Sequence, residues 1–184
     1  QYNGTNYWNQ LGQDIDGEVS GDRSGWSVSL SNDGTRVAIT SFYNDDSTEN
    51  AGSVRIYQYS GNSWNQIGQD IDGVGHTDLT NSVSLSADGN IVAIGAYSHD
   101  GTSGNDSGHV RIFQYNGTNY WNQIGQDIDG EAAEDRSGYS ISLSSDGTIV
   151  AIGAIYNDGN GNNSGHVRIY KNQSGTWTQI GQDI

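Results

Sequence analysis

The sequence predicts an all-β protein built of β-propeller-type blades. A segment that begins with tryptophan recurs at Trp8, Trp64, Trp121 and Trp177, at spacings of 56, 57 and 56 residues. A fixed period of this length indicates stacked supersecondary units. No window shows the 3.6-residue periodicity of an amphipathic helix, whereas short segments alternate apolar and polar residues as strands do. Together these features favour repeated antiparallel sheets.

Each repeat contains four strand-like segments, which predict one four-stranded antiparallel sheet. In the first segment Val28 and Leu30 face one side and serines face the other. An Asp-Gly turn joins the first segment to the second, and this turn is typical of a β-hairpin. The first segments begin at Trp26, Asn81 and Tyr139, the second at Arg36, Ile91 and Ile149, and the third at Ser53, His109 and His166. The tryptophan segment is the fourth.

Three repeats of about 57 residues follow an extra N-terminal copy of the outermost strand. The expected divisions are residues 1–15 for the extra outer strand, and 16–71, 72–128 and 129–184 for the three blades. An open, solenoid-like stack of sheets is the alternative architecture. Because closed propellers usually have four to eight blades, we expect half of a six-bladed ring, a filament subunit or part of a longer array. In each of these arrangements we expect the protein to self-associate, either by pairing of edge strands or by one chain completing a blade of another.

The run SGYSISLSSDGTIVAIGAIYNDGNGNNSGHVRIY, from Ser137 to Tyr170, resembles the FG-GAP repeats of integrin-α-type β-propellers. Those repeats have an FG-x-SV opening, a V-x-GAP strand and a G-x-V-x-V-[FY] strand. The resemblance implies a propeller fold, an extracellular or cell-surface location, and a role in adhesion or ligand binding. The calcium loop of that family lies between the first two strands, where this chain has only the tight SSDGT turn, so that loop is not carried over.

The amino-acid composition limits which kinds of molecule this protein is expected to bind. The formal net charge is −15 and only seven residues are Lys or Arg, which argues against nucleic acid or an anionic membrane surface. No apolar run approaches the length of a membrane span, and the absence of cysteine excludes disulfides and thiolate metal sites. Glycans, surface proteins and cations remain candidate partners.

Acidic residues gather between the fourth strand of one repeat and the first strand of the next. Their carboxylates are candidate ligands for Ca²⁺, which accepts six to eight oxygen atoms in flexible geometry. The alternative is that they cap turns and hold Arg23 and Arg136. The candidate metal ligands are Asp14, Asp16, Asp70, Asp72, Asp127, Asp129, Glu131 and Asp135.

A second polar loop joins the second and third strands of each repeat. Long polar loops on a rigid scaffold often carry binding residues. Their carboxylates could bind sugar hydroxyls and their tyrosine rings could contact a sugar face, or they could be solvated connectors. The candidate ligand-binding residues are Tyr43, Asp45, Tyr97, Asp100, Tyr156 and Asp158. Sequons for N-glycosylation begin at Asn3, Asn105, Asn116, Asn162 and Asn172.

Two further residue types recur in every repeat. The tryptophans of the fourth strand are expected to be packing anchors. Arg55, Arg111 and Arg168 of the third strand are expected to contact an aligned aspartate such as Asp70, Asp127 or Asp183.

Catalytic signatures are lacking. The histidines, His76, His99, His109 and His166, show no metal-ligand spacing, and no nucleophile elbow or phosphate-binding loop is found. The sequence therefore favours a non-enzymatic extracellular repeat protein that serves adhesion or structural assembly. The alternatives are a lectin-like carbohydrate-binding module and a polysaccharide-active hydrolase or lyase.

Overall fold

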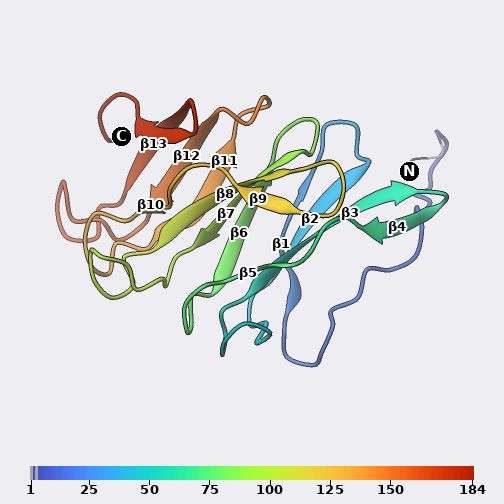
Figure 1. The fold of residues 1–184 in the computed structure, drawn as a ribbon, viewed down its shortest axis with the longest axis horizontal. Coiled ribbons are helices and arrows are strands. Elements are labelled where there is room, and N and C mark those ends of the chain that lie inside the picture. Colours follow the sequence, from blue (N-terminus) through green and yellow to red (C-terminus); the bar gives the residue numbers. More distant parts are fainter. Residues whose placement is uncertain (1, 3) are drawn as a thin grey trace.

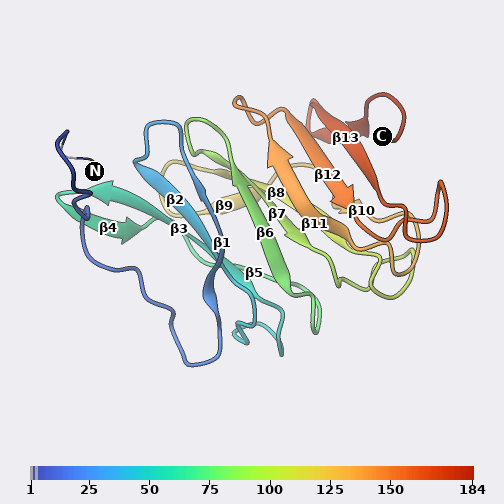
Figure 2. The same ribbon diagram turned by 180° about the vertical axis from the view of Figure 1, so that it is seen from behind.

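The computed structural model describes residue 2 and residues 4–184, and these residues form strands, turns and loops without a helix. Three antiparallel sheets lie side by side in a row, with the first and last sheets at opposite ends (Figures 1 and 2). The all-β prediction and the prediction of blade-type sheets are therefore confirmed. Within the described residues the row is open and does not close into a ring.

Each sheet corresponds to one predicted repeat. The first sheet contains β1 (Ser24–Leu30), β2 (Arg36–Ser41), β3 (Ser53–Ser60), β4 (Ser63–Gln66) and β5 (Ile71–Asp72). The second contains β6 (Thr80–Leu85), β7 (Ile91–Ala96), β8 (His109–Tyr115), β9 (Trp121–Gln123) and β10 (Ile128–Asp129). The third contains β11 (Ser137–Leu143), β12 (Ile149–Ala154), β13 (His166–Gln173) and β14 (Thr176–Gln179). Within each sheet the first four strands pair in sequence order, and in the first two sheets the short fifth strand, β5 or β10, pairs with the third strand, β3 or β8.

The predicted Asp-Gly hairpins are formed between the first two strands of each sheet. In the first, Asp33 Oδ1 accepts hydrogen bonds from the Ser31 hydroxyl at 2.7 Å and from the Thr35 N–H at 2.9 Å. Gly34 adopts a φ of 69°, which a glycine tolerates without strain. The turn is therefore stabilised by its own side chains, and the same bonds recur at Asp88 and Asp146.

The fourth strand differs from the continuous strand that the sequence predicts. In the first two sheets it is split into two short pieces, β4 with β5 and β9 with β10, and both pieces of a pair bind the same neighbouring strand. Between them Ile67 and Ile124 still donate to carbonyls of that strand, and the G-Q-D residues that follow leave the sheet. In the third sheet β14 is followed by Ile184, whose N–H donates to the Val167 carbonyl at 3.0 Å.

The residues that leave the sheet bind the next repeat. Gln69 donates to the Trp121 carbonyl at 3.1 Å and accepts from the Trp121 N–H at 3.0 Å. The Trp121 indole N–H donates to the Ile67 carbonyl at 2.9 Å. We call this set of three bonds the clasp. Gln126 forms the same clasp with Trp177, and Gln13 forms it with Trp64.

Apolar side chains fill the spaces between sheets. Val83 and Leu85 of β6 belong to one buried cluster with Ala38, Val54 and Ile56 of the first sheet. In the next interval, Leu143 of β11 clusters with residues of the second sheet, among them Ala93, Val110 and Ile112. The core is thus a series of thin layers between neighbouring blades, and each blade is completed by the next.

The recurring arginines bind the segment that enters their own repeat, and they do so through backbone carbonyls and not through the aspartate carboxylates that the sequence analysis expected. Arg55, Arg111 and Arg168 each donate from Nη2 to a backbone carbonyl, that of Asp16, Asp72 and Asp129 at 3.0, 2.7 and 2.9 Å. The carbonyl is favoured because the guanidinium is buried between sheets, where it meets main chain. Nearby carboxylates of Glu18 and Glu131 add ion pairs at 3.6 and 3.4 Å.

The predicted extra outer strand at residues 1–15 is not formed by the residues described there. These residues form only an isolated bridge between Tyr2 and Trp8, and Trp8 is 80% exposed. Among the described residues, this segment pairs with no strand of the three sheets. Instead, Leu11 and Gln13 provide the clasp for Trp64 of the first sheet.

Candidate functional site

The loops at one edge of each sheet are held together around a buried aspartate. Asp22, Asp78 and Asp135 are 3%, 1% and 3% exposed and accept backbone N–H groups of the loop that enters their repeat. In the first and third repeats the same carboxylate also accepts from an asparagine, Asn44 at 3.3 Å and Asn157 at 2.9 Å. Asp135, a predicted metal ligand, is thus used to close its loop.

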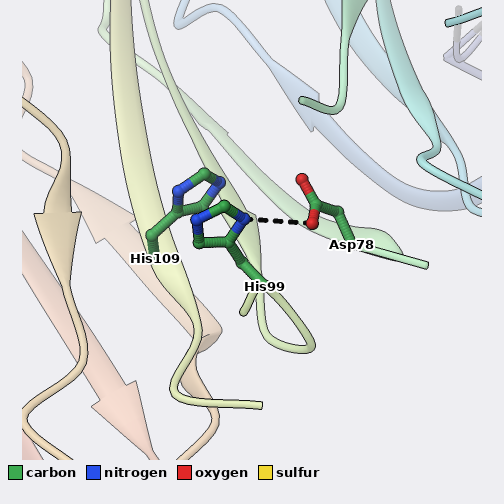
Figure 3. Close-up of side chains that lie close together, drawn as sticks. All are labelled: Asp78, His99 and His109. Atoms are coloured by element: carbon green, nitrogen blue, oxygen red, sulfur yellow. Dashed lines mark hydrogen bonds and ion pairs between the residues drawn. The ribbon is translucent and has the colours of Figure 1, made fainter. Parts of the chain in front are cut away.

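The second repeat has a histidine where the other two have asparagine. The ring nitrogen Nδ1 of His99 lies 3.0 Å from Oδ1 of Asp78, and its ring stacks on that of His109 with 3.8 Å between centroids (Figure 3). His109 begins β8 and is fully buried. Three elements therefore contribute to this cluster, namely the entry loop, the loop between β7 and β8, and β8 itself.

The two rings have different electrostatic environments. The hydrogen bond to Asp78 raises the pKa of His99, although burial opposes it. Burial, together with the charges of His99 and Arg111, lowers the pKa of His109 to about 3. Burial would raise the pKa of Asp78, but bonds from His99 and from the Gly75 N–H outweigh burial and hold the pKa below its usual value. His109 is therefore a neutral, buried nitrogen base at ordinary pH.

The predicted metal ligands are divided among several clusters. Asp127 and Asp129 lie with His109, Glu131 lies with His166 and Asp183, and Asp70 lies with Glu18 and Asp46. Within each of these clusters the candidate ligand atoms are at most 4.8 Å apart. The structure thus brings Asp127 and Asp129 together and places Glu131 in another set, whereas the carboxylate of Asp135 is bonded to Ala132 and Asn157.

Several of the predicted metal ligands also have contacts that support the fold. Asp14, Asp70 and Asp127 accept from a glutamine four residues earlier, which steadies the segment. Asp16 and Asp72 offer their carbonyls to arginines. Burial raises the pKa of the Asp72 carboxyl. Calcium binding by these residues stays a prediction.

The predicted ligand-binding residues lie on the loops between the second and third strands. Asp45, Asp100 and Asp158 each accept a backbone N–H across the loop, at 2.6, 2.8 and 2.7 Å, and so close it. Tyr43 and Tyr156 are each covered by a guanidinium, with Arg23 4.6 Å and Arg136 4.9 Å from the ring centroids. These contacts give these five residues a role in loop structure.

Tyr97 lies apart from Tyr43 and Tyr156 because its loop is offset by one residue. It takes the place of Phe42 and lines a cavity of about 370 Å³ together with Trp26, Tyr139 and polar residues of β6 and β11. The rings of Tyr97 and Tyr139 are 5.4 Å apart, and the Trp26 and Tyr139 side chains are 52% and 45% exposed. Trp26 of β1, Tyr139 of β11 and Tyr97, which follows β7, thus form a groove that we call the aromatic groove.

Of the predicted glycosylation sites, Asn105, Asn116 and Asn162 are exposed and Asn172 is half-buried. Asn3 lies outside the described residues. Glycosylation stays a prediction.

Sequence reasoning missed the pairing of His99 with His109. Aligning the loops on their tyrosines placed Tyr97 opposite Tyr43 and hid the match of His99 with Asn44 and Asn157. Aligning them on Asp45, Asp100 and Asp158 would have revealed that a histidine replaces an asparagine in one repeat.

Comparison with known proteins agrees with this architecture. Residues 128–170 match the family described as the FG-GAP repeat. The predicted resemblance is therefore confirmed for this part of the chain, which lies within a row of β-propeller-type blades. No curated protein matches the sequence, and no helix among the described residues is long and apolar enough to cross a membrane.

Several solved structures share the fold. A Bacteroides fragilis protein assigned as a 6-phosphogluconolactonase has a TM-score of 0.58 at 16% identity, covering 85% of this chain and 38% of its own. Sqt1 of Saccharomyces cerevisiae has a TM-score of 0.56 at 14% identity, covering 88% and 35%. Hydrazine synthase of Kuenenia stuttgartiensis has a TM-score of 0.51 at 10% identity, covering 94% and 38%. The chain thus spans less than two fifths of each of these proteins, and identities this low show the fold alone.

Proposed function

We propose that this protein is a non-enzymatic repeat module that acts outside the cell in adhesion or structural assembly, and that it assembles by stacking blade on blade. The observation that carries the proposal is that the two ends of the row bear the two halves of the contact that joins its own blades. A second copy of the chain therefore finds on each end face the surface that an internal blade already uses.

The first sheet exposes the half that β6 and β11 bury. Val28 and Leu30 are 61% and 60% exposed, whereas Val83 and Leu85 at the same positions of β6 are each 7% exposed. In a monomer this apolar face meets water, and exposed apolar surface of this kind is typical of interaction sites.

The third sheet presents the other half. Ala38, Val54 and Ile56 of the first sheet, and their equivalents in the second, are 0% exposed because the next blade covers them. The corresponding residues of the last blade, Ala151, Val167 and Ile169, are only half-buried. A neighbour that offers Val28 and Leu30 would cover them.

The two partners of one further clasp stand at opposite ends of the row of sheets. Gln182 stands where Gln69 and Gln126 stand in earlier segments, and Trp8 stands where their tryptophan partners stand. Trp8 is 80% exposed, whereas Trp121 and Trp177 are 3% exposed. Stacking two copies head to tail would let Gln182 of one bind Trp8 of the next. Two copies give six blades, within the closed range, and contacts that do not close give a filament.

The test is the mass of the native particle, measured by light scattering over a range of concentrations and combined with electron microscopy. Native protein should form dimers or filaments, and Leu30→Glu should reduce it to a monomer because a carboxylate cannot be buried on the facing blade. Val74→Glu is the matched control, since Val74 is 58% exposed away from both end faces and its equivalents are Glu18 and Glu131. A native chain that stays monomeric at every concentration would refute the proposal.

A lectin-like module is the second candidate, and the aromatic groove favours it. Sugar rings stack on exposed aromatic side chains while their hydroxyls bind polar groups, and the groove offers both. Glycan-array binding that Tyr139→Ala abolishes, and that the exposed control Tyr120→Ala leaves unchanged, would support it. An array signal no higher than background would count against it.

A further inference from the structure

We propose that the second repeat binds one first-row transition-metal ion, with Zn²⁺ as the reference ion, through Asp78, His99 and His109. These residues each offer a ligand atom, and the three atoms lie within 4.8 Å of one another (Figure 3). The site is independent of the proposed assembly, since it lies within one repeat. It also differs from the predicted calcium sites, which contain only carboxylates.

The strongest indication is His109. Its side chain is 1% exposed, and neither ring nitrogen has a hydrogen-bond partner among the residues that the structure describes. Leaving two buried polar atoms without a partner costs free energy, so native proteins rarely do it. A metal ion bound to one nitrogen would satisfy this ring.

The surrounding groups are arranged as a metal site requires. The Oδ1 atom of Asp78 is 3.0 Å from Nδ1 of His99, close to the separation of roughly 3.3 Å between neighbouring ligands around a tetrahedral Zn²⁺ with bonds of about 2.0–2.1 Å. The other oxygen, Oδ2, is occupied by the N–H groups of Val74 and Gly75 at 3.0 and 2.7 Å. Asp78 is therefore fixed with Oδ1 directed at the cluster.

A carboxylate stands behind His109. Its Nδ1 lies 3.8 Å from Oδ2 of Asp127, and metal-binding histidines commonly donate their second ring N–H to a carboxylate. This assigns Nδ1 to Asp127 and leaves Nε2 for the ion. Because an ion lies in the plane of each imidazole that binds it, the stacked rings must tilt apart on binding, and the loop carrying His99 includes Gly101 and Gly104.

The other repeats show that the fold does not need His99. Asn44 and Asn157 hold the same position and make the same bond to the buried aspartate. At the position of His109 the first repeat has Ser53, which is buried as well. Only the second repeat combines both histidines. Two imidazoles and one carboxylate suit zinc and its neighbours, whereas Ca²⁺ prefers oxygen ligands alone.

The experiment is calorimetric titration of the full chain, freed of metal by a chelator, with zinc chloride near neutral pH. We expect one binding event per chain that excess Ca²⁺ does not suppress. His99→Asn and His109→Ser should each abolish it, and both should fold because they copy residues of the other repeats. His76→Asn should bind as the native chain does, because His76 is exposed and paired with Glu49. Asp127→Asn should weaken binding by about 10–100-fold.

A second readout distinguishes this site from any other. Nitrogen NMR of the imidazoles should show zinc-dependent shifts of the ring nitrogens of His99 and His109, and not of His76. Two results would each overturn the proposal: no zinc binding, or binding that survives His99→Asn, including the case in which Asp127→Asn abolishes it. That case would place the ion between His109, Asp127 and Asp129 instead.

Discussion

Shortening the leucine side chain at the same repeat position in two different blades should change the free energy of unfolding by very different amounts. Leu85 closes β6, is 7% exposed, and packs with Ala38 and Ile56 of the preceding sheet. Leu30 closes β1 at the same position of its repeat and is 60% exposed. We therefore expect Leu85→Ala to be far more destabilising than Leu30→Ala.

The size of the difference follows from burial. Leucine to alanine removes three carbon atoms, and at about 0.8 kcal/mol per buried methylene this loses roughly 2.4 kcal/mol. The cavity left between two sheets raises the cost at Leu85 to roughly 3–4 kcal/mol. At Leu30 more than half of the side chain already contacts water, so the cost should be about 1 kcal/mol or less. The two midpoints of thermal unfolding should then differ by roughly 5–10 °C.

The assay is urea unfolding, followed by tryptophan fluorescence and circular dichroism at a concentration where the chain is monomeric. Leu143→Ala is a second buried test, because Leu143 is 9% exposed in the next interval between sheets. Free energies of unfolding for Leu30→Ala and Leu85→Ala that agree within about 0.5 kcal/mol would refute the blade-packing argument.

Two further outcomes are expected. Gly68→Ala should lower the free energy of unfolding, measured with urea, by about 1–3 kcal/mol. The reasons are that Gly68 has a φ of 78° and that an added Cβ would lie 2.5 Å from the Trp121 ring. The control Gly61→Ala should lower it by less, because Gly61 has a φ of 59° and open space around it. The pKa of Asp146 is lowered to about 2, first of all by the Ser144 hydroxyl bond, so NMR titration should find it still ionised near pH 3. This bond stabilises the fold above the usual aspartate pKa and is lost as pH falls through about 2, and Ser144→Ala should raise the pKa.

Local patterns predicted the inner strands because those patterns depend on neighbouring residues alone. The alternation around Val28 and the Asp-Gly turn at Asp33 define strands and hairpin without reference to the rest of the chain, and β1 and β2 lie where they were expected. The fourth strand was predicted as continuous because nothing in the sequence of the segment itself marks a break between its apolar residues. Its break at Gly68 depends on Trp121, which is 53 residues away, and no local pattern contains that contact.

The candidate metal site escaped prediction for the same reason. His99 and His109 are ten positions apart, with a loop between them whose course sets the distance between the rings. The sequence also suggested carboxylates as the partners of the arginines, because charge is visible in a sequence and an available backbone carbonyl is not. Arg111 instead binds the carbonyl of Asp72.

Because of the clasps, the resistance of the row of blades to a pulling force should depend on which end unfolds first. Trp121 and Trp177 are each held by a glutamine from the preceding repeat, since Gln69 binds Trp121 and Gln126 binds Trp177. If the first repeat unfolds, the second repeat loses the clasp on Trp121, and the second repeat is the one that provides the clasp on Trp177. Losing the third repeat leaves the clasps of the others in place. Under a pulling force, rupture that begins at the N-terminal blade should therefore travel along the chain, whereas rupture that begins at the C-terminal blade should stop after one blade.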